Sequence, residues 1–325
     1  MGHNARLLCE RYLLHGLFNL RPGVSTTTLG ALRDHRETAQ PPITPTGATL
    51  APSWIMEAGV GVLELTYGQF QTVYNILSFA LASMFATTIF LLAVQGRVLP
   101  RYRQAIVVSS IVTLIAAYHY WRIFESFKGS YVAVDAGEPA AAMDAMSYVL
   151  VNGEGFNEGY RYVDWLLTVP LLLFEAIAVL ALPAAVRRSL MLKLIPASVL
   201  MIVLGYPGEI TADTAPKAIW GALSTIPFLY ILYVLFVELT KATKTQPGQV
   251  AKDINGLRWL LLATWGVYPI SYMFPMFGLD GADAFVWRQV GYSLADVLAK
   301  CLFGLLIYKI AREKSAVDSA EFKEN

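Results

Sequence analysis

The stretch RYVDWLLTVPLLLFE, residues 161–175, decides the fold. Four residues stand out from its apolar background: Arg161, Asp164, Thr168 and Glu175. Their successive spacings of 3, 4 and 7 residues place them on one face of a helix. From Asp164 to Glu175 such a helix rises about 16 Å, which is about half the thickness of the hydrocarbon core of a bilayer. Charged groups at membrane depth are costly, so this stripe predicts a functional site inside a membrane helix.

Six further apolar segments flank this helix in the sequence. Each approaches the length of about 20 residues that a helix needs to cross a bilayer. The seven segments run approximately over residues 67–95, 103–126, 160–182, 190–207, 217–239, 256–276 and 285–311. Only 15% of the residues are charged, against about 25% in soluble domains. We therefore predict an all-α membrane protein, a bundle of seven transmembrane helices.

The charges of the loops predict the orientation of this bundle, because Lys and Arg near membrane ends stay on the cytoplasmic side. Basic residues gather after the first, third and fifth segments and at the C-terminal end, as at Arg101, Arg187 and Lys244. The other loops are acidic, as at Glu154 and Asp283. The N-terminus is predicted outside and the C-terminus in the cytoplasm, which agrees with an odd number of crossings.

Composition divides the chain into three regions. Residues 1–53 are rich in Arg and contain a polar stretch of Thr and Pro, which is typical of a targeting segment or of a disordered tail. Residues 54–314 read as one membrane domain and residues 315–325 as a cytoplasmic tail. The net charge of +1 gives no sign of a nucleic-acid partner. Cys9 and Cys301 lie far apart and do not indicate a disulfide framework, and we expect no metal site.

The last apolar segment carries Asp296 and Lys300, which lie one helical turn apart on one face. An ammonium at mid-membrane is strongly disfavoured unless it is paired or chemically altered. A lysine in an apolar site can act as a nucleophilic amine that forms a Schiff base with an aldehyde. A protonated Schiff base needs an anion beside it, and Asp164 and Asp296 are the candidates.

Ion pairs that only hold helices together are the simpler alternative for these charges. Two acids that face one lysine could serve that purpose, but Glu175, placed by itself near the opposite end, would then have no role. The alternative is stronger for His119 in the second segment. A single histidine inside a membrane can hydrogen-bond within the bundle, or it can hold Asp164 charged.

These residues resemble the signatures of microbial (type 1) rhodopsins, and the resemblance covers residues 67 to 314. Two of the family's central motifs resemble RYVDWLLTVP and the Asp-xxx-Lys of the last helix. A third motif, which lines the retinal pocket in the family, is similar to WGVYPISY, residues 265–272. Tyr272 departs from the family, which usually has Trp there. The resemblance implies all-trans retinal bound to Lys300 as a protonated Schiff base, in a light-driven ion transporter and not an enzyme.

Asp164, Thr168 and Glu175 occupy the three positions that distinguish functions within the family. Asp-Thr-Glu resembles the outward proton pumps of the proteorhodopsin and xanthorhodopsin types, whereas sodium pumps, chloride pumps and many sensors differ there. The resemblance implies Asp164 as counterion and proton acceptor, Asp296 as second counterion and Glu175 as proton donor. The supporting residues would be His119, Arg161 and Thr168. A sensory rhodopsin that signals to a partner is the main alternative, although a sensor does not need the fast reprotonation that Glu175 offers.

The resemblance also implies the surroundings of the pigment. The expected retinal pocket consists of Trp165, Leu172, Met201, Gly205, Trp265, Tyr268, Pro269 and Tyr272. Leu172 implies green absorption. Gly221 implies a window beside which a hydroxylated carotenoid could act as an antenna, although a glycine can also simply allow close helix packing.

Further expectations concern partners and the path of the proton. The family implies a homo-oligomer, a pentamer or a trimer, embedded in a lipid bilayer of the plasma membrane or of an organelle. Some relatives carry an acidic release group eight residues before the aspartate of the last helix. Arg288 stands at that position here, so we expect late proton release from Asp164 or its neighbours.

Overall fold

The computed structural model describes residues 63–134, 146–151, 156–211, 213–244, 246, 248–278 and 281–322. The predictions for residues 1–53 and for the loop acid Glu154 lie outside these residues. The α-helices are α3 (Tyr67–Val94), α4 (Pro100–Ser130), α5 (Gly159–Ala178), α6 (Ala184–Glu209), α7 (Thr214–Tyr233), α8 (Leu239–Thr243), α9 (Gly248–Tyr272), α10 (Gly281–Asp296) and α11 (Phe303–Asp318).

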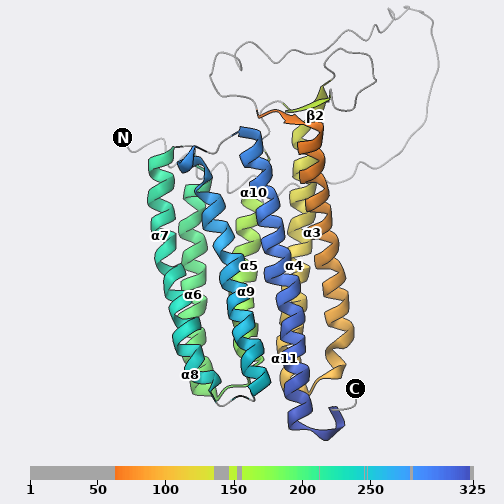
Figure 1. Ribbon diagram of the computed structural model, residues 1–325, viewed down its shortest axis with the longest axis vertical. Helices are drawn as coiled ribbons and strands as arrows, with labels where there is room; N and C mark the ends of the chain where they lie inside the picture. The colour runs from red at the N-terminus through yellow and green to blue at the C-terminus, as the bar shows by residue number, and fades with distance from the viewer. Residues whose placement is uncertain are drawn as a thin grey trace, which may run out of the picture. The chain divides into compact units, whose positions relative to one another are not determined.

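Two π-helical segments join some of these helices into longer rods. Segment η3 (Val234–Glu238) links α7 to α8, and η5 (Val297–Leu302) links α10 to α11. The described residues therefore form seven helical rods, which run side by side in Figure 1. The predicted bundle of seven helices is confirmed, and each apolar segment of the sequence corresponds to one rod.

Five of the seven rods are long and apolar enough to cross a membrane: Tyr67–Arg97, Pro100–Ser130, Ala184–Glu209, Thr214–Lys241 and Gly281–Asp318. The other two rods, α5 and α9, do not meet these criteria of length and apolar composition. In α5 the reason is its charge, because every run of 18 residues within the helix includes Arg161, Asp164 and Glu175. The functional stripe predicted from the sequence is thus also what makes this helix look unlike a membrane span.

Local signals in the sequence set several helix starts. Thr66 and Gln69 form a capping box at the start of α3, in which each side chain accepts a hydrogen bond from the backbone N–H of the other residue. Pro100 stands in the first turn of α4, where its missing N–H and fixed φ cost nothing. Short 3₁₀ segments follow α3, α9 and α11: η1 (Gln95–Arg97), η4 (Phe274–Phe277) and η6 (Ala320–Phe322).

A small antiparallel sheet lies at one end of the bundle. Strands β1 (Leu65–Thr66), β3 (Ser147–Leu150) and β2 (Tyr131–Val134) pair in that order, and β2 continues directly from α4. The rings of Phe70 and Tyr148 stack with centroids 3.9 Å apart and fasten the sheet to α3. We call the end of the bundle that carries this sheet the strand end. The last turn of α11 lies at the opposite end (Figure 1).

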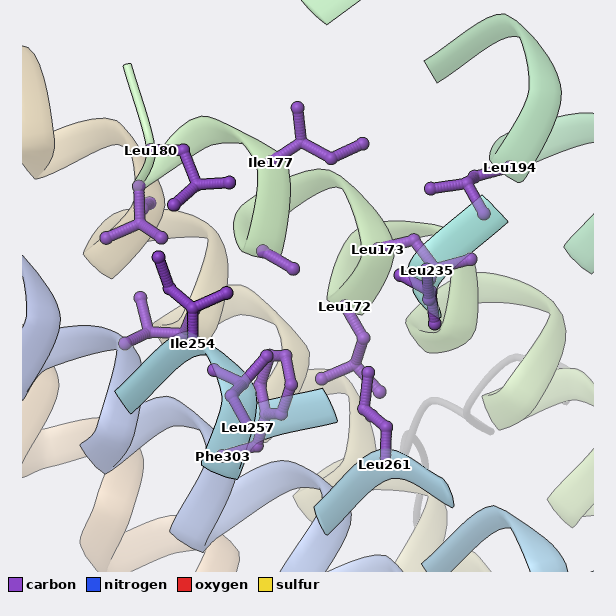
Figure 2. Close-up of a cluster of buried hydrophobic side chains, with 14 of the residues drawn as sticks. Leu172, Leu173, Ile177, Leu180, Leu194, Leu235, Ile254, Leu257, Leu261 and Phe303 are labelled. Atoms are coloured by element: carbon purple, nitrogen blue, oxygen red, sulfur yellow. The ribbon is translucent and has the colours of Figure 1, made fainter. Parts of the chain in front are cut away.

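A buried apolar cluster lies in the half of the bundle away from the strands. Figure 2 shows part of it in close-up. The cluster includes Leu172, Leu173, Ile177, Leu180, Leu194, Leu235, Ile254, Leu257, Leu261 and Phe303, which come from α5 and the turn after it, and from α6, η3, α9 and α11. The cluster is a water-excluding layer between the opposite end and the charged groups at the centre of the bundle.

Candidate functional site

Lys300 lies at the centre of the site, inside the π-helical segment η5. Its Nζ donates to Asp164 Oδ2 over 2.7 Å and to Asp296 Oδ1 over 2.6 Å. All three side chains are 1% exposed. The helical spacing of Asp296 and Lys300 places them one turn apart, and α5 supplies Asp164 from across the bundle. The structure thus brings together the three groups that the sequence singled out as amine and counterions.

The two carboxylates are held differently. Asp296 accepts three hydrogen bonds in addition to that of Lys300, from Tyr268 OH (2.6 Å), Tyr120 OH (2.8 Å) and Trp165 Nε1 (3.2 Å). Asp164 Oδ1 has no hydrogen-bond partner among the described residues. Hydrogen bonds to a carboxylate favour its charged form, so Asp296 is built to stay an anion. Asp164 keeps an oxygen free to take up a proton.

Two predicted supporting residues lie next to Asp164. His119 Nδ1 is 3.7 Å from Asp164 Oδ1 and 2.9 Å from the main-chain oxygen of Ile115. Both interpretations of this histidine therefore have a contact in the structure, one within its own helix and one toward the carboxylate. The Thr168 hydroxyl donates to the main-chain oxygen of Asp164 over 2.8 Å. It thus ties the turn of α5 that carries Asp164 and does not contact the carboxylate oxygens.

Arg161 lies on the strand side of this centre. Its side chain is 1% exposed, and its Nη1 is 3.9 Å from Asp296 Oδ2. Nη1 also donates to Tyr120 OH over 3.0 Å. The guanidinium therefore acts on Asp296 partly through the tyrosine that bonds the same carboxylate oxygen. With the carboxylates of Asp164 and Asp296, the ammonium of Lys300 and this guanidinium, the charges of the centre itself balance.

Glu175 lies on the other side of the centre, three turns along α5 from Asp164. Its side chain is completely buried, and the Ser109 hydroxyl donates to Oε2 over 2.5 Å. Within the described part of the chain, Oε1 has no hydrogen-bond partner. Leu172, Leu173 and Ile177, which flank Glu175 in the sequence, belong to the apolar cluster of Figure 2. A carboxyl group in such surroundings is favoured in its neutral form, because burial penalises the charge.

A largely apolar cavity ends at the Lys300 amine. It has an empty volume of about 850 Å³, counting the space at its mouth. Its wall contains all eight residues of the expected pocket: Trp165, Leu172, Met201, Gly205, Trp265, Tyr268, Pro269 and Tyr272. Gly221, Asp296 and Lys300 also border it. Ligand cavities are typically apolar with a few well-placed polar groups, so the residues present fit an apolar aldehyde bonded to the amine.

Tyr272, which departs from the family pattern, fills the space beside Gly221. A Cβ built on Gly221 would lie 2.8 Å from Cε1 of the Tyr272 ring. The Tyr272 hydroxyl donates to the main-chain oxygen of Lys217 over 2.7 Å, which holds the ring in place. The glycine borders the cavity as expected, but the tyrosine ring occupies the place that a window would need.

Several residues of the site were not identified from the sequence. Tyr120 bonds Asp296, and Ser109 bonds Glu175; both come from α4. The cavity wall contains eight further residues: Tyr162, Val169, Ile202, Ser224, Thr225, Phe228, Tyr292 and Ala299. Hydroxyl groups within an apolar segment were the available signal for Ser109 and Tyr120, but nothing in the spacing of α4 shows which partner each one meets.

Comparisons with known proteins agree with this geometry. Residues 69–314 match the family model described as bacteriorhodopsin-like protein. The chain is similar to the green-light absorbing proteorhodopsin of Gamma-proteobacterium EBAC31A08, with 32% identity over 236 residues that cover 72% of this chain and 84% of the relative.

Two solved structures are also similar to the chain. The crystal structure of thermophilic rhodopsin has a TM-score of 0.73 and 44% sequence identity, and it covers 79% of this chain and 99% of its own. The structure of xanthorhodopsin, described as a light-driven ion pump with dual chromophore, has a TM-score of 0.72 and 44% sequence identity. The match covers 79% of this chain and 98% of the xanthorhodopsin chain.

Proposed function

The chain belongs to the family of bacteriorhodopsin-like proteins, and from this membership we propose that it is a light-driven pump that moves protons outward across a membrane. As a member it is an integral, multi-pass membrane protein. The observation that carries the proposal is the buried arrangement of Lys300 with two aspartates at the end of an apolar cavity, with Glu175 buried on the other side. Retinal bonded to Lys300 would supply light absorption and a change of shape at the nitrogen.

The first proton transfer is assigned to Asp164. Its Oδ2 lies 2.7 Å from Lys300 Nζ, within the distance at which a proton passes between two groups. Asp296 lies equally close to the nitrogen, but its other hydrogen bonds hold it as an anion. The proton of the Lys300 nitrogen would therefore move to Asp164, on the side of the bundle that carries Arg161 and the strands.

The second proton transfer is assigned to Glu175. Its buried carboxyl would keep a proton until the Lys300 nitrogen has lost its own, and it would then supply the replacement. The apolar cluster of Figure 2 lies on this side and limits the access of water. A donor and an acceptor on opposite sides of one nitrogen give the transport its direction. Because a sensor needs no fast donor, this arrangement favours a pump over the sensory alternative.

We propose that the strand end faces outward and that the opposite end faces the cytoplasm. The opposite end carries many basic residues: Arg97, Arg101, Arg187, Arg188, Lys241, Lys309 and Arg312. Basic residues at membrane ends favour the cytoplasmic side. Large apolar side chains on the outside of the rods, such as Phe79 and Ile226, fit lipid as the surrounding partner. Assembly as a pentamer or trimer remains a proposal from the family resemblance.

The carotenoid antenna is a finer prediction that depends on Gly221. Because the Tyr272 ring takes the space beside this glycine, a carotenoid ring could reach the wall of the cavity only if Tyr272 moved. Retinal is therefore the pigment that we propose, and the antenna stays a prediction. Adding a hydroxylated carotenoid to the pigment and recording the action spectrum of transport tests it, since a bound antenna adds a new excitation band.

Transport is tested by expressing the full chain with all-trans retinal and illuminating unbuffered cells. Outward pumping predicts acidification of the medium that an uncoupler abolishes. Lys300→Ala is the control without pigment. A pigment that forms but gives no pH change, both in the wild type and in Glu175→Gln, would contradict the pump and favour a sensor.

A further inference from the structure

Lys314, near the end of α11, is a lysine buried at the opposite end of the bundle. It is 7% exposed, and its Nζ donates to the main-chain oxygen of Leu180 over 3.1 Å and to Gln246 Oε1 over 2.5 Å. Nζ also lies 5.4 Å from the centre of the Tyr102 ring. One ammonium therefore joins three parts of the chain: the turn after α5, the connection between α8 and α9, and the start of α4.

Two of these contacts lie next to the segments that hold the proposed proton donor. Leu180 follows Glu175 by five residues, in the turn where α5 ends. On α4, Tyr102 precedes Ser109 by seven residues, and the Ser109 hydroxyl donates to Glu175. Residues seven apart share a face of a helix and lie about 10 Å from each other. Lys314 therefore bridges the segments that hold Glu175, on the side of the donor that faces the opposite end.

Glu175 is closed off on this side. The carboxyl is completely buried, and Tyr102, Ile106 and Leu180 of the apolar cluster are at most 2% exposed. In the proposed pump, however, Glu175 gives its proton to the Lys300 nitrogen in every cycle and must take a new one from the cytoplasm. The cover over the donor therefore has to open once per cycle and then close again.

Lys314 is the part of this cover that can open most easily, because its partners are neutral. It contacts a carbonyl, an amide oxygen and the face of a ring. The carboxylate of Asp318, one turn further along α11, is bound by Tyr102 OH and by Arg101 instead. An ammonium is strongly hydrated and sits on a flexible stem of four carbons, so water can replace neutral partners. The bonds of Asp318 can hold α11 against α4 while the Lys314 side chain moves.

We propose that Lys314 is the latch over the proton donor, which closes the path between the cytoplasm and Glu175 until the donor must be recharged. The inference rests on the proposed function above. When the latch opens, the ammonium leaves Leu180 and Gln246 for water, and cytoplasmic water reaches the donor. A hydronium ion then gives up one proton, which forms an O–H bond on the Glu175 carboxylate, and a neutral water molecule remains. Lys314 keeps its own protons throughout, so it is a positioning residue and not a carrier.

The test measures how fast the Glu175 proton exchanges with solvent in the dark. The full chain, purified with all-trans retinal, is transferred to heavy water. Infrared absorption follows the carboxylic C=O stretch, which moves to lower frequency when deuterium replaces the proton, and its loss in Glu175→Gln identifies the band. In Lys314→Met, exchange should be faster than in the wild type by at least about tenfold, the factor that corresponds to one lost hydrogen bond of a charged group. A wild-type rate in this variant would overturn the latch.

The matched control is Lys309→Met. Lys309 lies on the same helix and at the same end, but it is exposed and pairs with Asp253 and Glu313. This variant should exchange at the wild-type rate. A general effect of removing a positive charge from this end would speed exchange in both variants alike, which would contradict the latch. Backbone amide exchange, read from the same spectra, should be equal in all three proteins. Faster amide exchange in Lys314→Met would assign the effect to a loosened bundle and not to the latch.

Flash kinetics test the latch in the working cycle. A pH-indicating dye should show a shorter delay between the loss of the Glu175 proton and proton uptake in Lys314→Met. Loss of the proton from the Lys300 nitrogen should keep its wild-type rate, because Asp164 is unchanged.

A second variant keeps the test decisive if Lys314→Met forms no pigment. Gln246→Leu removes one acceptor of the latch and should speed dark exchange by about two- to tenfold. An unchanged rate overturns the latch and leaves the pump intact. A wild type that moves no protons outward overturns the pump, while the dark exchange, which needs no transport, decides separately whether Lys314 covers Glu175.

Discussion

Replacement of Gly221 by alanine is a change whose cost can be worked out from the structure. The added Cβ would lie 2.8 Å from Cε1 of Tyr272 and 3.6 Å from its Cδ1 and Cζ. Carbon atoms in good contact lie about 3.5 to 4.0 Å apart, so the ring would have to move by about 0.7 Å.

The Tyr272 ring has little room for this movement. Its hydroxyl donates to the main-chain oxygen of Lys217, and Lys217 Nζ lies 4.8 Å from the centre of the ring. On another side, the hydroxyl takes the place that a side chain on Gly208 would have. Overpacking of this kind costs about 1 to 3 kcal/mol, and a broken hydrogen bond adds about 1 kcal/mol. Alanine recovers about 0.5 to 1 kcal/mol over glycine in a helix, so the net loss is about 1 to 3.5 kcal/mol.

The assay is the rate at which the visible band of the retinal-bound protein bleaches at a fixed, raised temperature. If the strain is relieved in the transition state for unfolding, the loss corresponds to bleaching about 5- to 400-fold faster than in the wild type. Gly266→Ala is the matched control, because Gly266 also lies in a helix and has nothing within 4 Å of an added Cβ. It should bleach no faster than the wild type.

Equal bleaching rates for the two alanine variants would refute the assignment of the Tyr272 ring to the space beside Gly221. A double variant, Gly221→Ala with Tyr272→Phe, refines the test. The ring without its hydroxyl has no hydrogen bond to lose when it moves. The two changes together should therefore cost about 1 kcal/mol less than the sum of the single changes.

Three further predictions concern the centre of the site. Lys300→Ala and Lys300→Arg should both stay colourless with all-trans retinal, because neither offers a free amine; a coloured variant would contradict the attachment site. Asp164→Asn should keep a visible band but stop outward transport in illuminated cells, and normal acidification would exclude Asp164 as the acceptor. Glu175→Gln should slow the return of the proton to the Lys300 nitrogen by about 100-fold or more; flash absorption measures this, and a wild-type rate would disprove the donor role.

The last helix shows how much of the fold could be predicted from the sequence. The apolar run 285–311 predicted one helix with Asp296 and Lys300 on one face, and the structure has this arrangement. It does not have a regular α-helix, because Val297–Leu302 is π-helical. Such a segment depends on how a helix packs against its neighbours and is frequent at functional sites. Hydropathy predicted where the helix lies in the sequence. The geometry of the helix at Lys300 depends on tertiary packing, which hydropathy does not describe.

In the site, helical spacing predicted which residues share a face of a helix, but it did not predict which groups form hydrogen bonds with each other. Thr168 shares a face with Asp164, yet its hydroxyl bonds the main chain. Tyr120 and Ser109 lie on α4 and meet partners on α10 and α5. Contacts between helices are set by the register of one rod against another. Spacing within one helix contains no information about that register, and a resemblance transfers only the residues that its motifs include.

Helix α5 shows how charges of this kind can exist inside a membrane. Arg161, Asp164 and Glu175 are at most 1% exposed, so the lipid does not meet them. The large side chains that α5 does expose are Val163, Leu166 and Leu167. Within the bundle, the charge of Asp164 is balanced by Lys300 from another rod, and removal of one partner of a buried pair costs about 3 to 5 kcal/mol. Burial against the other rods, with Lys300 as the partner of Asp164, is therefore what makes the charges of α5 compatible with a membrane.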